Sequence, residues 1–298
     1  MELAARRITK NFGAELSGVD LRRPLTQAMR DAIISAIEIY GVCVFHDTRL
    51  NDETHIAFSH QLGEVYVQPK THGRVQRPLA PELFEAGNLG PDNEILRSPI
   101  AQIGRRGNEQ WHTDHSFIAN RSAYSLLLAH EIPEGQGDTN FADTRSAYEA
   151  LPQEMKAKLE GLIAEHSIWY SRMTAGYPVT EDEIRDREPY ASHPLVHLHQ
   201  GSGRKALYIA SHIREVDGIE TAQARAMIKE LIEFATQPQF TFTHAWREGD
   251  LVIWDNRCTM HCATRFEDEE KRRDLRRTNI LDPVRLPVEI VRPPELVD

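Results

Sequence analysis

Residues 251–261 read LVIWDNRCTMH, a stretch that joins a core strand to a candidate metal ligand. Its first four residues are all apolar and follow the turn at residues 248–250, a pattern typical of a buried strand. The stretch ends at His261. We therefore predict a β-rich core in which this strand leads toward a functional histidine.

A second stretch, residues 111–114, reads WHTD and places His112 and Asp114 two positions apart. Side chains alternate between the two faces of a strand, so on a strand both would point the same way. A short His-x-Asp pair is a weak signal by itself, because such pairs occur by chance. Together with His261 from a distant strand, however, it gives the two-histidine, one-carboxylate set of non-haem Fe(II) oxygenases. We predict that these three residues bind a catalytic metal.

The whole chain of 298 residues is expected to form a single domain over 1–298. β-sandwiches and barrels reach this size as one domain, and no linker or internal repeat divides the sequence. The predicted fold is mainly β with helical decoration, in the manner of a sandwich or jelly roll. Periodicity and end signals predict helices at 26–39, 51–62 and 219–236, two short helices in 143–164, a hairpin at 193–209, and strands at 42–45, 240–246, 251–254 and 278–281.

Between residues 68 and 108 the periodic pattern disappears. Five prolines interrupt it: Pro69, Pro78, Pro81, Pro91 and Pro99. A long segment without regular structure in a compact domain usually has a function. We therefore predict an active-site loop at 68–108.

Composition excludes several classes of partner. The chain has 35 basic and 45 acidic residues, a net charge of −10, which disfavours binding to a nucleic-acid backbone. It has no apolar run long enough to span a membrane, and its start lacks the apolar core of a secretory signal. The three cysteines are too few for a disulfide framework. We expect a cytoplasmic homo-oligomer that binds a small anionic organic molecule, with no nucleic-acid or membrane partner.

Four motifs together resemble the taurine/2,4-dichlorophenoxyacetate dioxygenase (TauD/TfdA) family. They are WHTD at 111–114, GDT at 137–139, WDNR at 254–257 followed by His261, and the arginine-rich stretch 272–277. The resemblance covers nearly the whole chain, and AYEALP at 147–152 is more similar to the phenoxyacetate dioxygenase branch. It implies a double-stranded β-helix and an oxygenase that uses Fe(II), 2-oxoglutarate and O2, with ascorbate as the reductant in vitro.

The resemblance also implies roles for individual residues. The same three metal ligands are implied, and Thr139 and Arg273 would hold the distal carboxylate of 2-oxoglutarate. Arg277 would bind the anionic group of the substrate. A guanidinium offers a planar, permanently charged fork that suits a carboxylate. Arg273 and Arg277 would both face inward if their strand begins early enough, and the choice of Arg273 over Arg272 depends on how the preceding acidic loop aligns.

The predicted substrate is an aryloxyalkanoate, such as 2,4-dichlorophenoxyacetate or a 2-aryloxypropionate. Hydroxylation would cleave the ether to a phenol plus glyoxylate or pyruvate, with release of succinate and CO2. Taurine is disfavoured because Gln68 stands where taurine dioxygenase has a sulfonate-binding histidine. Lys70, Asn108 and His199 are further candidate substrate contacts.

Other functions remain open. The same oxygenase chemistry could act on a sulfonate, an alkyl sulfate or another small carboxylate. A zinc hydrolase could use the same triad with a metal-activated water, but it would not need Thr139 or Arg273. A non-catalytic metal-binding jelly roll is a third possibility. The pair His197 and His199 could ligate zinc from one strand, but no carboxylate or cysteine has a suitable spacing, so hydrogen-bonded core histidines are favoured.

Overall fold

The computed structural model describes residues 2–69, 77–185 and 187–283. Its largest sheet has seven strands in the order β1-β2-β3-β13-β5-β15-β4. Neighbouring strands are antiparallel except β2 and β3, which are parallel. The bounds are β1 (Ala4–Arg7), β2 (Ala14–Ser17), β3 (Val42–Phe45), β13 (Leu251–Asp255), β5 (Ser122–Glu131), β15 (Asp274–Leu281) and β4 (Phe84–Glu85).

Smaller sheets complete the β structure of the described residues. Their strand orders are β12-β6-β14, β11-β7-β8 and β10-β9. The bounds are β12 (Thr241–His244), β6 (Thr139–Asp143), β14 (Thr259–Ala263), β11 (Ile213–Val216), β7 (Ile163–Ser167), β8 (Tyr190–Pro194), β10 (Arg204–Leu207) and β9 (Val196–His199). One buried apolar cluster joins Phe141 of β6 to Leu127, Trp254 and Leu275 of the large sheet. The two sheets therefore pack face to face around this core.

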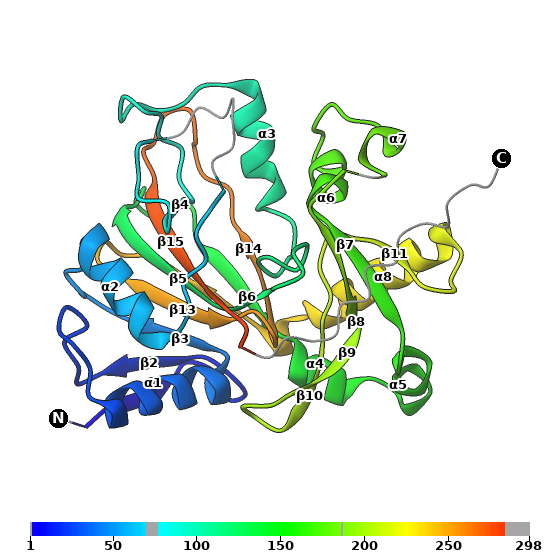
Figure 1. Cartoon of the computed structure of the whole chain (residues 1–298), viewed down its shortest axis with the longest axis horizontal. Helices are drawn as coiled ribbons and strands as arrows, with labels where there is room; N and C mark the ends of the chain where they lie inside the picture. The colour runs from blue at the N-terminus through cyan, green and yellow to red at the C-terminus, as the bar shows by residue number, and fades with distance from the viewer. Residues whose placement is uncertain (1, 70–76, 186, 284–298) are drawn as a thin grey trace.

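Helices cover the face of the large sheet that is turned away from the β6 sheet, and further helices surround the β7 sheet at the other end of the molecule (Figure 1). A second apolar cluster packs Ile33 and Phe58 of the first two helices against Leu126 and Ile253 of the large sheet. The long helix α8 packs through Ile228 in a third cluster with the β7 sheet. The helices are α1 (Gln27–Tyr40), α2 (Asp52–Leu62), α3 (Pro99–Gly107), α4 (Thr144–Ala150), α5 (Gln153–Leu159), α6 (Ile168–Thr174), α7 (Glu181–Ile184), α8 (Thr221–Ala235) and the 3-10 turn η1 (Pro238–Phe240). In the described ranges, none of them is long and apolar enough to cross a membrane.

The sequence signals at helix ends are confirmed. The Thr26 hydroxyl accepts a hydrogen bond from the Met29 amide (3.2 Å) and so caps α1, as Ser, Thr, Asp and Asn do at helix starts. Gly41 ends the same helix with φ at 74°, a conformation that favours glycine. Asn51 caps α2 in the same way as Thr26 caps α1. The predicted hairpin forms as β9 and β10, α8 forms as predicted, and the chain is mainly β with helices.

Two expectations about local structure are wrong. The segment 68–108 is not a continuous irregular loop, because it contains β4 and the nine-residue helix α3. Pro99 does not interrupt α3 but begins it, where its missing amide hydrogen leaves no bond unmade. The second error concerns 111–114, which is not a strand: only His112 forms an isolated bridge, to His261. Lys70 lies outside the described residues.

Candidate active site

Backbone pairing brings two of the predicted metal ligands together. The His112 amide donates to the His261 carbonyl (3.0 Å), and the His261 amide donates to the His112 carbonyl (2.8 Å). Because the chain turns at Asp114, strand alternation does not orient that residue. Instead, the Asp114 amide donates to Oδ1 of Asn256 (3.0 Å), and the Thr113 hydroxyl donates to the Asn256 carbonyl (2.7 Å). The turn between β13 and β14 therefore positions the carboxylate.

The three side chains converge as a metal site requires. One ligand atom from each of His112, Asp114 and His261 lies within 4.8 Å of the other two, and each residue is at most 6% exposed. Nδ1 of His112 donates to the Gln110 carbonyl (2.7 Å), which leaves the Nε2 lone pair free to bind a metal. Burial lowers the pKa of both histidines, so both are neutral ligands at pH 7.

The Asp114 carboxylate has a partner on each oxygen. Ser125 Oγ donates to Oδ2 (2.7 Å), and Nη1 of Arg277 donates to Oδ1 (2.5 Å). Burial alone would raise the pKa of this carboxyl group, but the Arg277 charge and the neighbouring His261, His112 and His115 together outweigh burial and hold the pKa below its ordinary value. The group is therefore ionised at neutral pH, as a metal ligand must be.

Thr139 lies on the same face of the β6-β14 pair as His261. In the register of these strands Phe141 is opposite His261 and Thr139 is opposite Ala263, two positions further along. Two residues of strand correspond to about 7 Å, a separation comparable to the length of a five-carbon dicarboxylate. The Thr139 hydroxyl accepts a hydrogen bond from Trp246 Nε1 (3.0 Å) and still has its own proton to donate.

Arg273 is a buried cation, and among the described residues no carboxylate forms an ion pair with it. Its Nη1 donates to the Ala86 carbonyl (2.6 Å) and its Nη2 to the Gly137 carbonyl (2.9 Å), while Nε is buried without a hydrogen-bond partner. Burial lowers the pKa of Arg273 to about 10. An incoming carboxylate would satisfy Nε and balance the charge, so these residues fit 2-oxoglutarate.

The strand β15 resolves which arginines face inward. It begins at Asp274, directly after Arg273, and Leu275 points into the core between the sheets. By alternation, Arg277 lies on that same inner side. Arg273 precedes the strand, and its hydrogen bonds to the Ala86 and Gly137 carbonyls show that it is also turned inward. Arg272 instead pairs with Glu131 (2.9 Å), and its side chain is 32% exposed.

Aromatic side chains around the triad were not identified from the sequence. The His212 ring lies 5.6 Å from that of His112, and the Phe117 ring lies 5.1 Å from that of His212. The ring of Phe84 lies 4.8 Å from the Arg277 guanidinium carbon. Phe117 and His212 come from irregular segments and Phe84 from a two-residue strand, so no periodicity marks them.

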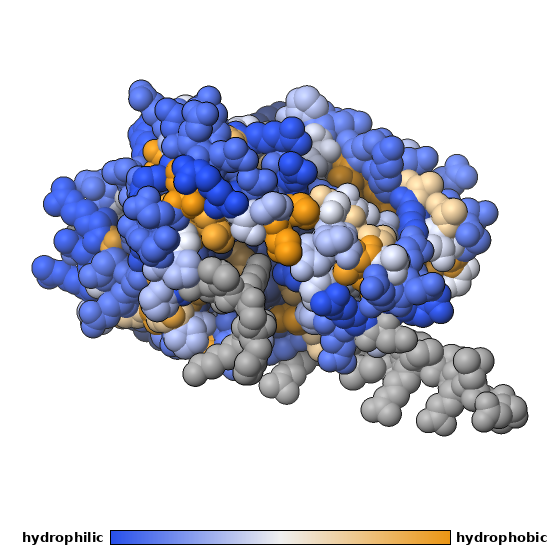
Figure 2. All heavy atoms as spheres, turned by 90° about the horizontal axis from the view of Figure 1, so that it is seen from above, coloured by the Kyte–Doolittle hydropathy of each residue, from blue (hydrophilic) through white to orange (hydrophobic). Residues whose placement is uncertain are grey.

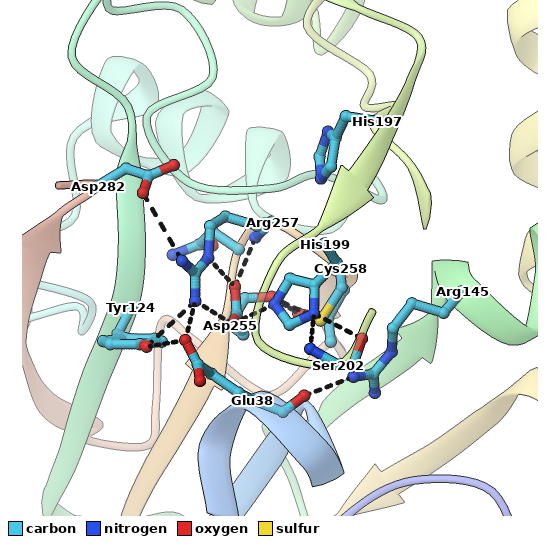
Figure 3. A network of polar contacts seen from close by, with 12 residues as sticks. Glu38, Tyr124, Arg145, His197, His199, Ser202, Asp255, Arg257, Cys258 and Asp282 are labelled. Carbon is cyan, nitrogen blue, oxygen red and sulfur yellow. Dashed lines mark hydrogen bonds and ion pairs between the residues drawn. The ribbon is translucent and has the colours of Figure 1, made fainter. Parts of the chain in front are cut away.

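His199 belongs to a separate buried network (Figure 3). Its Nε2 bonds to Oδ2 of Asp255 (2.9 Å) and its Nδ1 to the Ser202 hydroxyl (2.7 Å). Arg257 donates to the same Asp255 carboxylate, and Cys258 lies within 4.8 Å of the histidine. The expectation that no carboxylate or cysteine would join this histidine is therefore wrong. Because both ring nitrogens already have partners, the structure does not support His199 as a substrate contact.

Asn108 lies at the end of α3 and is exposed. Its carbonyl accepts from the Ala263 amide (2.8 Å), which ties the helix end to β14. It borders a hollow of about 310 Å³ that Arg273 also lines. A larger hollow, of about 620 Å³, lies over the N-terminal strands and contains none of the predicted site residues.

Comparisons with known proteins find similar sequences and a similar structure over most of the chain. The chain is 36% identical over 286 residues to the alpha-ketoglutarate-dependent 2,4-dichlorophenoxyacetate dioxygenase of Cupriavidus pinatubonensis, which covers 95% of this chain and 99% of that protein. It is 33% identical over 271 residues to the (S)-phenoxypropionate/alpha-ketoglutarate-dioxygenase of Sphingobium herbicidovorans, covering 88% and 89%. Among solved structures, that of AAD-2 in complex with Mn(II) and N-oxalylglycine superposes with a TM-score of 0.85 at 36% identity, covering 96% of this chain and 98% of that one.

A family model described as "Taurine catabolism dioxygenase TauD, TfdA family" matches residues 4–279. That range contains the metal triad, Thr139 and both inward arginines. The chain therefore belongs to the TauD/TfdA family of dioxygenases.

Proposed function

We propose that this chain, a 2-oxoglutarate-dependent dioxygenase, hydroxylates an aryloxyalkanoate. We also propose that its fold is a double-stranded β-helix. The observation that carries the proposal is the combination of the metal triad with two inward arginines, Arg277 on β15 and Arg273 directly before it. One arginine suits the cosubstrate and the other an anionic substrate. A zinc hydrolase would have no use for the buried Arg273.

The chain's residues have distinct tasks in this reaction. His112, Asp114 and His261 are the ligands for Fe(II). Thr139 and Arg273 hold the distal carboxylate of 2-oxoglutarate, which fixes the cosubstrate beside the triad. When bound, Fe(II), 2-oxoglutarate and O2 supply the oxidising chemistry that releases succinate and CO2.

Arg277 orients the substrate by its carboxylate. Its Nη1 reaches Asp114 Oδ1, so a carboxylate bound to this arginine lies next to the metal site. The carbon between that carboxylate and the ether oxygen is then the one presented for hydroxylation. The hemiacetal formed there breaks down to a phenol plus glyoxylate, or pyruvate from a 2-aryloxypropionate.

Aromatic surroundings support an aryl group over a small aliphatic one. Phe84 packs on Arg277, and Phe117 packs on His212 beside His112. Seen from the side that carries α3, apolar residues gather near the middle of a mostly hydrophilic face (Figure 2). Two relatives are named for phenoxyacetate and phenoxypropionate substrates.

Succinate release by the purified protein tests the proposal, with Fe(II), ascorbate and 2-oxoglutarate under air. The parallel substrates are 2,4-dichlorophenoxyacetate, both enantiomers of a 2-aryloxypropionate, taurine and an alkyl sulfate. Succinate that rises with an aryloxyalkanoate, together with an equal amount of phenol, is the expected result. Succinate coupled to taurine or to the alkyl sulfate instead would overturn the substrate assignment while leaving the oxygenase assignment intact.

A further inference from the structure

A serine at the middle of β5 is in contact with the metal-binding carboxylate. Ser125 is fully buried, and its hydroxyl donates to Asp114 Oδ2 (2.7 Å). Nothing in the sequence motifs marks this residue. Its importance follows from the two other hydrogen bonds that reach the same oxygen.

Two side-chain amides donate to the Ser125 oxygen. Nδ2 of Asn256 lies 2.8 Å from Oγ, and Nδ2 of Asn279 lies 2.7 Å from it. A hydroxyl group has one proton to donate and two lone pairs to accept with. Since both lone pairs are taken, the hydroxyl proton can only be directed at Asp114.

The orientation of each amide is fixed independently. Oδ1 of Asn256 accepts from the Trp254 indole (3.0 Å), which has only a donor, and Oδ1 of Asn279 accepts from Arg277 Nε (3.1 Å). Flipping either amide would put its NH2 group against these donors. Both asparagines are at most 3% exposed. A buried network whose members are all satisfied holds one arrangement.

We propose that Ser125 is a positioning residue that orients the Asp114 carboxylate for metal binding, an inference that rests on the metal site of the proposed function. Through Asn279 the same hydroxyl is linked to Arg277, so the metal ligand and the substrate arginine belong to one network. A residue that hydrogen-bonds to a metal-binding side chain holds that side chain in the geometry that the metal requires. Such residues contribute to metal affinity. Their loss typically weakens metal affinity by about 10- to 100-fold.

Mn(II) binding to the full chain tests this role, with free Mn(II) measured by electron paramagnetic resonance. The variant Ser125→Ala removes the hydroxyl, and Ser125→Cys keeps the side-chain shape but offers only a weak S–H donor. Ser59→Ala is the matched control. Ser59 is also fully buried, its hydroxyl donates to the His55 carbonyl (2.8 Å) and contacts Thr278 (2.7 Å), and it does not touch the triad.

We expect the Mn(II) dissociation constant to rise about 10- to 100-fold in Ser125→Ala and to stay unchanged in Ser59→Ala. The visible absorption spectrum of the Co(II)-loaded protein should shift in the Ser125 variants only. Should Ser125→Ala not fold, Ser125→Cys gives the result, with a smaller loss of affinity. Wild-type affinity and spectrum in a folded Ser125 variant would overturn the inference. Equal Mn(II) binding by wild type and His112→Ala would instead overturn the metal site itself.

Discussion

Replacing Arg273 by methionine is expected to weaken 2-oxoglutarate binding without removing the metal. Arg273 is 6% exposed, and within the part of the chain that the structure describes it has no carboxylate partner and its Nε has no hydrogen-bond acceptor. Losing one member of a buried ion pair costs about 3–5 kcal/mol. The lower end of this energy range applies to Arg273, because its two terminal nitrogens already donate hydrogen bonds to backbone carbonyls. A loss of about 3 kcal/mol corresponds to an affinity that is about 100-fold weaker.

Two measurements check this value. The KM for 2-oxoglutarate comes from succinate release at saturating substrate. The dissociation constant of N-oxalylglycine, whose NH group replaces a CH2 of 2-oxoglutarate, comes from calorimetry on the Mn(II)-loaded protein. Both should rise by about 100-fold, while Mn(II) affinity stays at the wild-type value.

Arg272→Met is the matched control, because Arg272 is the adjacent arginine and faces outward to Glu131. An exposed ion pair contributes little, so we expect less than a twofold change, roughly the effect of a few tenths of a kcal/mol. Near-ultraviolet circular dichroism confirms that each variant is folded. If Arg273→Met binds N-oxalylglycine as wild type does, or if Arg272→Met shows the larger loss, the assignment of the carboxylate site is wrong.

Further outcomes follow from the same geometry. His112→Ala should keep the fold by circular dichroism but lose Mn(II) binding; retained binding would contradict the triad. Arg277→Leu should raise the KM for an aryloxyalkanoate by about 10- to 100-fold, from the loss of a charge-assisted contact of about 1.5–3 kcal/mol, and an unchanged KM would refute substrate binding there. Gly137→Ala should weaken N-oxalylglycine binding, because φ is +71° and the new Cβ would lie 3.0 Å from Arg273 Nε; calorimetry on Mn(II)-loaded protein decides this. Burial lowers the pKa of His199, but the neighbouring thiol and carboxylate raise it to about 10. Protonated His199 therefore stabilises the folded state fully below pH 6.5, and this stabilisation is lost as the pH rises toward 10. Over that range the thermal midpoint of the wild type should fall more steeply than that of His199→Gln.

Local sequence determined much of the secondary structure. Thr26 and Asn51 cap α1 and α2 through hydrogen bonds to residues three positions away, so the cause and the effect lie in the same short segment. The periodicity of α8 and the glycines between β9 and β10 act over equally short distances. The metal-ligand set was also readable, because few other chemistries need two histidines and one carboxylate in this pattern.

Local signals failed where one residue type has two roles. By its sequence context Pro99 counts as a breaker, but proline suits the first position of a helix as well as it suits a loop, and here it begins α3. The alternation rule failed at Asp114 for a related reason. It applies only within a strand, and the chain leaves its single bridge at His112.

The tertiary structure alone decided how the site residues are oriented and paired. Asn256, 142 residues away, receives the Asp114 amide, and Ser125 fixes the carboxylate from a neighbouring strand. Likewise, hydrogen bonds to the Ala86 and Gly137 carbonyls hold Arg273 inward, whereas Arg272 lies partly exposed beside Glu131. Sequence therefore determined which chemical groups are available and which short segments are regular, since those depend on residue type and on near neighbours. The direction of each side chain at the site was decided by long-range hydrogen bonds and strand register, which exist only once distant segments have packed together.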